Sequence, residues 1–445
     1  MNISLLWKKI KEGVKNFDFF ALGNFAVLYY LVTFYLTPFL VFLGFPIEYR
    51  YSGLTVYKIN YQALFYLAIG FVSMVAGYFS PLPKFSIKRL PNILKTEWNF
   101  KMVPWVFGGV FIIGIGAKFL RIFGGAYYHL VRTPWLTTSS WYGVVGYLDW
   151  FFYFALVIAF ISYFHLKKNG DKRYRQWRVV AWGTFALEML YAFPMCGRLE
   201  IIVPVILYLI VKFYFLNIPW WKIILIGLGL SIVLFPFGIV CRSPETLETY
   251  SVVEDIEDVR VVSDIADNRI VNIKKIPVFI SDTFIARMDQ SVLFLKLVEA
   301  ELPSLRGKPL LKFFISFIPR PLWENKPTIN IDGNAFGHLI NILSPGDSMT
   351  SVGPTIVGDW YWNFGVVGII FGMFFMGFLW RIFYEYLIKG TVLSLSGVFI
   401  YSVVFVQVVK GIENEIVSVY AGLAKFLIIL LIIHFFLTWK SKKEL

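Results

Sequence analysis

The chain has 445 residues, of which 58% are hydrophobic, 19% aromatic and only 16% charged. Soluble domains are about 45–50% apolar and about 25% charged, so this composition excludes a soluble enzyme and a disordered protein. The net charge of +14 does not indicate nucleic acid as a partner, because the basic residues stand mostly between apolar runs. The composition predicts a polytopic membrane protein.

Ten apolar stretches are long enough to cross a bilayer as helices, which takes about 20 residues. They lie at 19–44, 61–80, 103–123, 144–166, 179–195, 199–217, 222–241, 361–383, 392–410 and 421–439. The fifth and sixth are the weakest, because the short polar segment between them is also compatible with a kink in one long helix. The predicted fold class is all-α, a polytopic bundle of about ten transmembrane helices with one large extracytoplasmic loop that contains amphipathic helices.

Lysine and arginine are concentrated in 81–101, in 167–178, after 439 and in the first 15 residues. Ten spans place these four segments on one side, and such segments are typical of the cytoplasmic side. The basic N-terminal stretch leads into a long apolar run without a small-residue cleavage site, which predicts an uncleaved first span. We therefore expect a multi-pass membrane protein with both termini in the cytoplasm.

This topology divides the chain into spans one to seven (1–241), an extracytoplasmic loop (242–355) and spans eight to ten (356–445). The loop is acidic at first, then amphipathic at 280–302 and 310–318, and rich in proline afterwards. Amphipathic helices of this kind lie on a membrane surface or cover a cavity between spans. Because long connections are seldom without function, we expect the loop to carry much of an active site.

Several cationic side chains are expected on the outer face, where such residues are rare near helix ends. They are Arg198, Arg242, Arg287, Arg320 and Lys326. One interpretation is a shared anion site, since guanidinium binds phosphate oxygens through paired hydrogen bonds. The alternative is that each side chain reaches lipid headgroups or pairs with a loop carboxylate.

The segment IPRPLWENKP at 318–327 is the most informative part of the loop. Its prolines favour an extended chain, and Arg320, Trp323 and Lys326 place two cations and an aromatic ring within seven residues. This mixture suits a phosphate joined to a sugar, but it also suits an anchor at the membrane interface.

Two side chains are candidates for positioning or deprotonating an acceptor hydroxyl. Asp359 stands at the outer mouth of the eighth span, where it is either a charge at a helix start or a general base. His338 is the second candidate, because histidine is a residue type suited to proton transfer near neutral pH, although a single loop histidine is usually incidental. Asp289, beside Arg287, is a third candidate that balances charge. Gly368 and Gly372 form a GxxxG pattern that predicts close helix packing only.

Further along, the sequence resembles the O-antigen polymerase, or oligosaccharide repeat unit polymerase, family. The resemblance rests on the turn Gly197-Arg198, on FIPRPLWENKP at 317–327 and on VGPTIVGDWYWNFGVVGIIFGMFFMG at 352–377. Members commonly carry Glu before the aromatic-Asn-Phe-Gly segment, where this chain has the shorter Asp359.

The resemblance implies a membrane-embedded C-type glycosyltransferase without metal or cofactor. Such an enzyme joins oligosaccharide repeat units on the outer face of the bacterial cytoplasmic membrane. Its expected partners are undecaprenyl-diphosphate-linked oligosaccharides, membrane lipids, a chain-length regulator and a flippase, with no nucleic acid. The expected catalytic residues are Asp359, His338 and Arg287. The expected diphosphate- and sugar-binding residues are Arg198, Arg242, Arg320, Trp323 and Lys326.

Two other functions stay open at this point. An O-antigen ligase transfers a finished glycan from the same kind of carrier and shares this architecture, although the segment 318–327 favours the polymerase. A lipid-linked oligosaccharide flippase belongs to another class, and it should show polar residues through several spans and two equivalent halves. Here the spans are apolar and the polar residues gather at one face.

Overall fold

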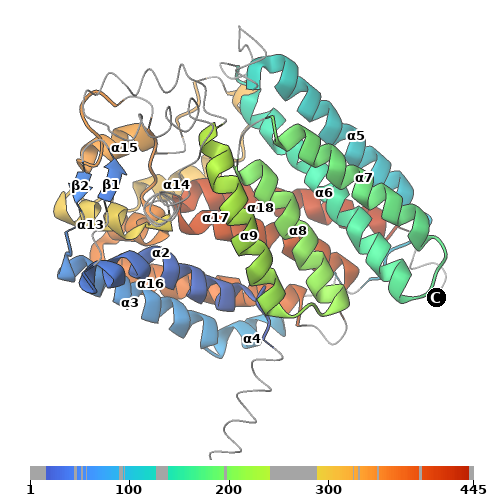
Figure 1. The fold of residues 1–445 in the computed structure, drawn as a ribbon, viewed down its shortest axis with the longest axis horizontal. Coiled ribbons are helices and arrows are strands. Elements are labelled where there is room, and N and C mark those ends of the chain that lie inside the picture. The colour runs from blue at the N-terminus through green and yellow to red at the C-terminus, as the bar shows by residue number, and fades with distance from the viewer. Residues whose placement is uncertain are drawn as a thin grey trace, which may run out of the picture.

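The chain folds as a bundle of long helices in the computed structural model (Figure 1). The structure describes residues 17–44, 48–51, 54–56, 58–89, 94, 96–126, 139–194, 198–240, 288–323, 325–328, 331–347, 350–389 and 393–439. Within these residues the only strands are those of one short antiparallel hairpin, β1 (Glu48–Tyr51) and β2 (Leu54–Val56). The predicted all-α membrane fold is confirmed.

All ten predicted spans coincide with helices. These helices are α2 (Leu22–Phe42), α3 (Tyr61–Phe79), α5 (Val103–Arg121), α6 (Tyr142–Lys168), α7 (Tyr174–Ala192), α8 (Arg198–Leu216), α9 (Trp220–Val240), α16 (Thr355–Leu387), α17 (Leu395–Ile412) and α18 (Ile416–Leu437). Eight described helices are long and apolar enough to cross a membrane, which makes the protein a multi-pass membrane protein. The eight exclude α7, and α9 is counted as a shorter apolar helix over Trp220–Ser231.

The fifth and sixth predicted spans are two separate helices. The helix α7 ends at Ala192 and α8 begins at Arg198, and the two pack against each other and against α6. One continuous kinked helix is therefore excluded. The helix α7 is not among the eight candidate spans because it carries the charged residues Arg175, Arg178 and Glu188.

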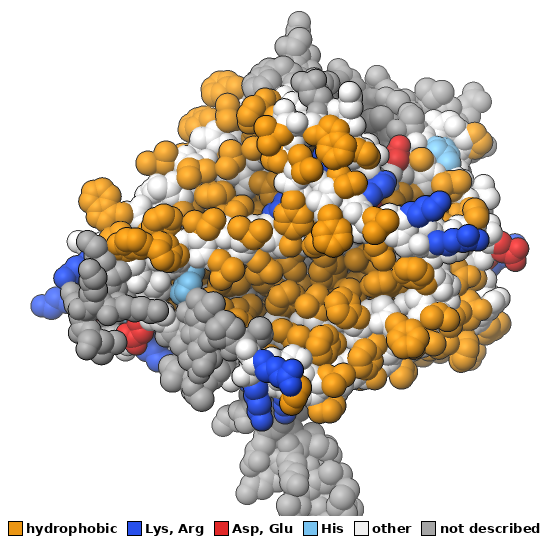
Figure 2. Space-filling view, turned by 180° about the vertical axis from the view of Figure 1, so that it is seen from behind, with side chains coloured by type: hydrophobic (Ala, Val, Ile, Leu, Met, Phe, Trp, Pro, Cys, Tyr) orange, Lys and Arg blue, Asp and Glu red, His pale blue; other side chains and the backbone are white. Residues whose placement is uncertain are grey.

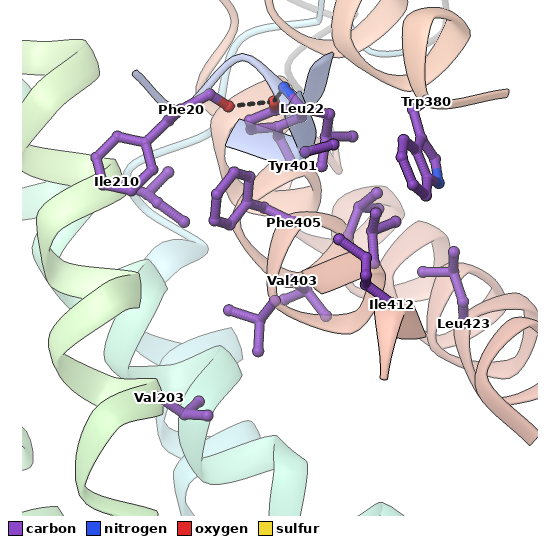
Figure 3. Close-up of a cluster of buried hydrophobic side chains, with 14 of the residues drawn as sticks. Phe20, Leu22, Val203, Ile210, Trp380, Tyr401, Val403, Phe405, Ile412 and Leu423 are labelled. Atoms are coloured by element: carbon purple, nitrogen blue, oxygen red, sulfur yellow. Dashed lines mark hydrogen bonds between the residues drawn. The ribbon is translucent and has the colours of Figure 1, made fainter. Parts of the chain in front are cut away.

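The helix α17 lies at the centre of the bundle and contacts α6, α8, α16 and α18. In its apolar stretch, 83% of the residues are buried, the largest share among the candidate spans. Tyr401 of α17 ties the start of α2 to this centre, because its hydroxyl donates to Phe20 O at 2.5 Å and accepts from Leu22 N at 3.1 Å (Figure 3). Phe405 packs edge-to-face on Phe20 in the same cluster.

Glycines set the close crossing of α3 and α16. A Cβ on Gly77 would meet Phe374 O at 2.0 Å, and one on Gly377 would meet Met74 O at 2.0 Å, so only glycine lets these backbones touch. The predicted GxxxG pair serves a different contact. Gly368 and Gly372 make room for Trp360 of the same helix, which folds back over a kink in α16.

The remaining described elements are short. They are α4 (Leu82–Ile87), the π-helix η2 (Ile122–Ala126), α13 (Ser291–Glu299), α14 (Lys308–Ile315), the 3-10 helix η3 (Arg320–Leu322) and α15 (Gly333–Leu339). The elements α13, α14 and α15 gather with the hairpin at one end of the bundle (Figure 1). The face of the bundle shown in Figure 2 presents a broad area of hydrophobic side chains, as a lipid-facing surface requires.

Candidate functional site

The candidate site lies around a kink in α16. Gly365 has φ 63° and ψ −150°, a conformation that is essentially restricted to glycine. The carbonyl groups of the preceding residues point to the loop before α14: Trp362 O accepts from Leu305 N at 3.0 Å, and Asn363 O accepts from Arg306 N at 3.1 Å. The aromatic-Asn-Phe-Gly segment therefore binds the loop before α14 to the bundle through its backbone.

Asp359 lies six residues before this kink and is almost fully buried, with 2% of its surface exposed. Its Oδ1 accepts from Asn363 Nδ2 at 2.8 Å, and its Oδ2 accepts from Ile416 N, the first residue of α18, at 2.8 Å. The carboxylate thus satisfies a free N–H at the start of α18 and stands where the helix dipole favours negative charge. This geometry gives Asp359 a positioning role, while its predicted part in proton transfer stays a prediction.

His338 lies in α15 and is half-buried. Its Nε2 is 2.9 Å from the carbonyl oxygen of Asp347. Because a carbonyl can only accept, Nε2 carries the proton and donates it, which leaves Nδ1 as the nitrogen able to accept a proton. The helix is placed by Phe336, whose ring contacts that of Trp362 at 5.3 Å between centroids. His338 therefore belongs to the same end of α16 as Asp359.

The loop 316–326 carries the other described candidates. Lys326 is 8% exposed, and its Nζ donates to Ile318 O at 2.6 Å and to Ser316 O at 3.3 Å, so it closes the loop on itself. Burial and the charge of Arg320 both lower the pKa of Lys326. Arg320 is exposed, and Trp323 is 38% exposed. The two predicted cations thus lie close enough to repel each other, with the aromatic ring in the same loop.

The loop also meets a lysine that the sequence reading did not select. Lys425, in α18, lies with its Nζ 5.9 Å from the ring centroid of Phe317 and 5.0 Å from that of Tyr147 in α6. Its Nζ also donates to the Tyr147 hydroxyl at 3.3 Å. The sequence feature that could have identified Lys425 is its position as a lysine within an apolar span, because ionisable residues in spans are functional candidates by default.

A second group of charges lies between α5, α6 and α7. Lys118 Nζ is 3.0 Å from both Asp149 Oδ1 and Glu188 Oε2, and Arg121 pairs with the other oxygen of Asp149. The ammonium of Lys118 also lies 3.9 Å from the ring centroid of Tyr191. These two cations and two carboxylates balance within the bundle.

Two further carboxylates at this end of the bundle are buried. Asp289 is 1% exposed, and its Oδ1 accepts from Ser291 N at 2.8 Å and from Ser291 Oγ at 2.6 Å. Glu415 precedes α18, and its Oε2 accepts from Ile331 N at 2.8 Å. Burial raises the pKa of each side chain to about 7. Glu415 was not predicted from the sequence, because its partner Ile331 is 84 residues away in the chain.

Three of the predicted arginines cannot be placed. Arg242 and Arg287 lie outside the described residues, and so does the side chain of Arg198. Arg320 is the one member of the predicted arginine set that the described structure locates. The shared arginine site therefore stays a prediction. Among the described side chains there is no group of three His, Cys, Asp or Glu residues that could hold a metal ion.

Comparison with known proteins gives one match. Residues 335–437 match the family described as Putative O-antigen polymerase. The matched part runs from α15 through α16 and α17 to the end of α18, and it includes His338, Asp359 and Lys425. The resemblance predicted from the sequence is thereby confirmed for the C-terminal part, while 317–327 precede the match. No curated protein and no solved structure matches the chain.

Proposed function

We propose that this chain, whose residues 335–437 match the O-antigen polymerase family, is a membrane glycosyltransferase that polymerises oligosaccharide repeat units carried on a lipid diphosphate. A polymerase or ligase type of membrane function follows from the family. The polymerase, its undecaprenyl diphosphate carrier, its independence of metal and its place on the outer face of the bacterial cytoplasmic membrane are the proposal.

One observation carries it. The helices within the family match are the ones that the segment 305–326 contacts: α14 contacts α18, the loop before α14 binds the kink of α16, and Lys425 of α18 lies over the ring of Phe317 in the loop 316–326. The fold thus brings Arg320, Trp323 and Lys326 to the same end of the bundle as Asp359 and His338. The family resemblance and the residue chemistry point to one end of one bundle.

The chemistry needs little more than positioning and charge. In the proposed reaction, the bond between the anomeric carbon of the growing chain and its diphosphate oxygen breaks. The bond from that carbon to a hydroxyl oxygen of the incoming unit forms. The diphosphate leaves with the electron pair, so cations such as Arg320 stabilise it, an effect typically worth on the order of 10²–10³ in rate. The hydroxyl proton passes to a base, for which His338 Nδ1 and the carboxylate of Asp359 are the candidates.

The same reasoning extends to Arg198, Arg242 and Arg287, which we propose as further ligands of the diphosphate. Trp323 offers a ring face that packs on the C–H face of a sugar. The proposed partners are undecaprenyl-diphosphate-linked oligosaccharides and membrane lipids, with a chain-length regulator and a flippase acting before or after the transfer.

Deletion of the gene in its host separates the three candidate functions. Loss of a polymerase leaves single repeat units on the lipid carrier at the outer face, with no long glycan. Loss of a ligase instead leaves long glycans on the carrier, and loss of a flippase leaves single units at the inner face. We expect the first result, restored by the intact gene. Either of the other two patterns would overturn the polymerase assignment.

A further inference from the structure

The most unusual charges at the outer end of the bundle are those of Lys425 and Lys326. They come from α18 and from the loop 316–326. Lys425 Nζ lies 5.9 Å from the ring centroid of Phe317, and Lys326 Nζ donates to the carbonyl oxygens of the two residues on either side of that phenylalanine. Arg320 acts electrostatically on Lys326. Three cations therefore share one neighbourhood, although like charges at short range repel and each has to be desolvated in part.

Nothing in the described parts of the chain neutralises this group. Neither Lys425 nor Lys326 forms an ion pair with a described carboxylate. Asp149, two residues beyond Tyr147 on α6, is already engaged by Lys118 and Arg121. Partly buried cations without a carboxylate are costly unless a ligand supplies the negative charge.

The side chains around the two lysines indicate which other chemical groups the ligand should contain. The ammonium of Lys425 faces the rings of Phe317 and Tyr147, and Trp323 lies in the same loop. On the lipid side, the neighbouring segment exposes several large apolar side chains, namely Leu311, Phe314, Ile318 and Leu322. A ligand that combines a phosphate with an apolar tail matches both features.

We propose that Lys425, together with Lys326 and Arg320, forms a phosphate-binding site between α18, α6 and the loop 316–326, and that it takes the diphosphate of a polyprenyl-linked sugar. This inference rests on the proposed function and deepens it, because it adds a binding residue from within the bundle. In this site, the ammonium of Lys425 binds the diphosphate from within the bundle, and the exposed guanidinium of Arg320 binds it from the surface. The apolar side chains of 311–322 contact the lipid tail.

The closing experiment measures binding of farnesyl diphosphate to the full chain in nanodiscs of phosphatidylcholine. Lys425→Gln should weaken binding at least about tenfold, as expected for one hydrogen bond to a charged group, and Lys425→Arg should keep most of it. Arg320→Gln changes an exposed side chain and should weaken binding several-fold. Lys212→Gln is the matched control, because its ammonium also lies over a tyrosine ring, 5.1 Å from Tyr208, but on α8. This control should bind as the unaltered protein does.

A second arm separates the two sources of phosphate. In nanodiscs enriched in phosphatidylglycerol, farnesyl diphosphate should still bind with nearly unchanged affinity, because one headgroup phosphate carries less charge than a diphosphate. Full competition by phosphatidylglycerol would mean that the lysines hold a phospholipid headgroup, and it would overturn the proposal. Equal affinities for the unaltered protein, Lys425→Gln and Arg320→Gln would overturn it as well.

The failure of this site and the failure of the proposed function have different signatures. If Lys425→Gln loses binding while the gene deletion gives no polymerase phenotype, the phosphate site stands and the polymerase assignment falls. If the deletion phenotype is that of a polymerase and Lys425→Gln binds normally, the function stands and this site is refuted.

Discussion

Replacing Asp359 with asparagine tests the contact that holds α16 to α18. Both partners of the carboxylate are donors, Asn363 Nδ2 and Ile416 N, each at 2.8 Å. An amide can accept from only one of them and turns an NH₂ toward the other. The variant therefore loses one hydrogen bond to a charged group, worth about 1.5–3 kcal/mol, and places two donors face to face at a buried site. This loss corresponds to a factor of about 10–150 in the equilibrium for opening the contact.

The measurement is hydrogen exchange at the Ile416 amide in purified protein, together with the melting temperature. We expect exchange at Ile416 to accelerate at least about tenfold and melting to fall by a few degrees. Asp332→Asn is the control, because Asp332 is an exposed cap of α15 that accepts from the N–H groups of Asn334 and Ala335. Asparagine and aspartate cap helices equally well, so this variant should change little. Unchanged exchange and melting in Asp359→Asn would refute the anchoring role. Loss of polymer length in normally folded Asp359→Asn protein would support proton transfer.

Three other variants test the fold around the site. Gly365→Ala should lower the yield and the melting temperature, because alanine at this φ and ψ is strained by about 1–3 kcal/mol. The control Gly183→Ala lies on the exposed face of α7 and should change neither quantity. Equal yields and melting temperatures for the two variants would contradict the strained conformation at Gly365. Glu415 holds its proton more tightly in the folded chain, with its pKa raised from 4.5 to about 7. The folded state therefore binds more protons, and stability should fall as the pH rises from about 4.5 to about 7, a slope that Glu415→Gln should reduce in pH-dependent melting curves. Lys118→Met should cost about 3–5 kcal/mol because it strips Glu188 of its cation, and adding Glu188→Leu should recover most of that loss; additive losses would contradict the pairing.

The helices were predictable because a bilayer makes a simple demand on sequence. A spanning helix has to be apolar over its whole length, so the ten predicted stretches and the ten helices coincide. The exception is instructive. The helix α7 carries Glu188 inside the bundle, where Lys118 of α5 neutralises it, and no local pattern reveals that pairing. The GxxxG pattern indicated close packing but not its partner, which is Trp360 of the same helix beyond the kink at Gly365.

The candidate site was predictable only in part, because its contacts join residues far apart in the chain. Asp359 was recognisable at the mouth of a span, but its bond to Ile416 crosses 57 residues. Lys326 was recognisable as a candidate ligand, but the sequence does not reveal that two of its three ammonium donors bind carbonyl oxygens of its own loop, which leaves one for a phosphate. Lys425 was overlooked because nothing near it in sequence resembles a phosphate site, and its neighbours Tyr147 and Phe317 come from α6 and from the loop 316–326.

The most direct test of the central claim is chain growth by the purified protein. The full chain is reconstituted in liposomes with a single lipid-diphosphate-linked repeat unit from its host, with a chelator present, and the products are separated by length. The account predicts a ladder of glycans that remain on the lipid carrier, with release of the free lipid diphosphate and a slower rate for Lys425→Gln than for Lys212→Gln. A repeat unit that stays single, with no lipid diphosphate released, would contradict it.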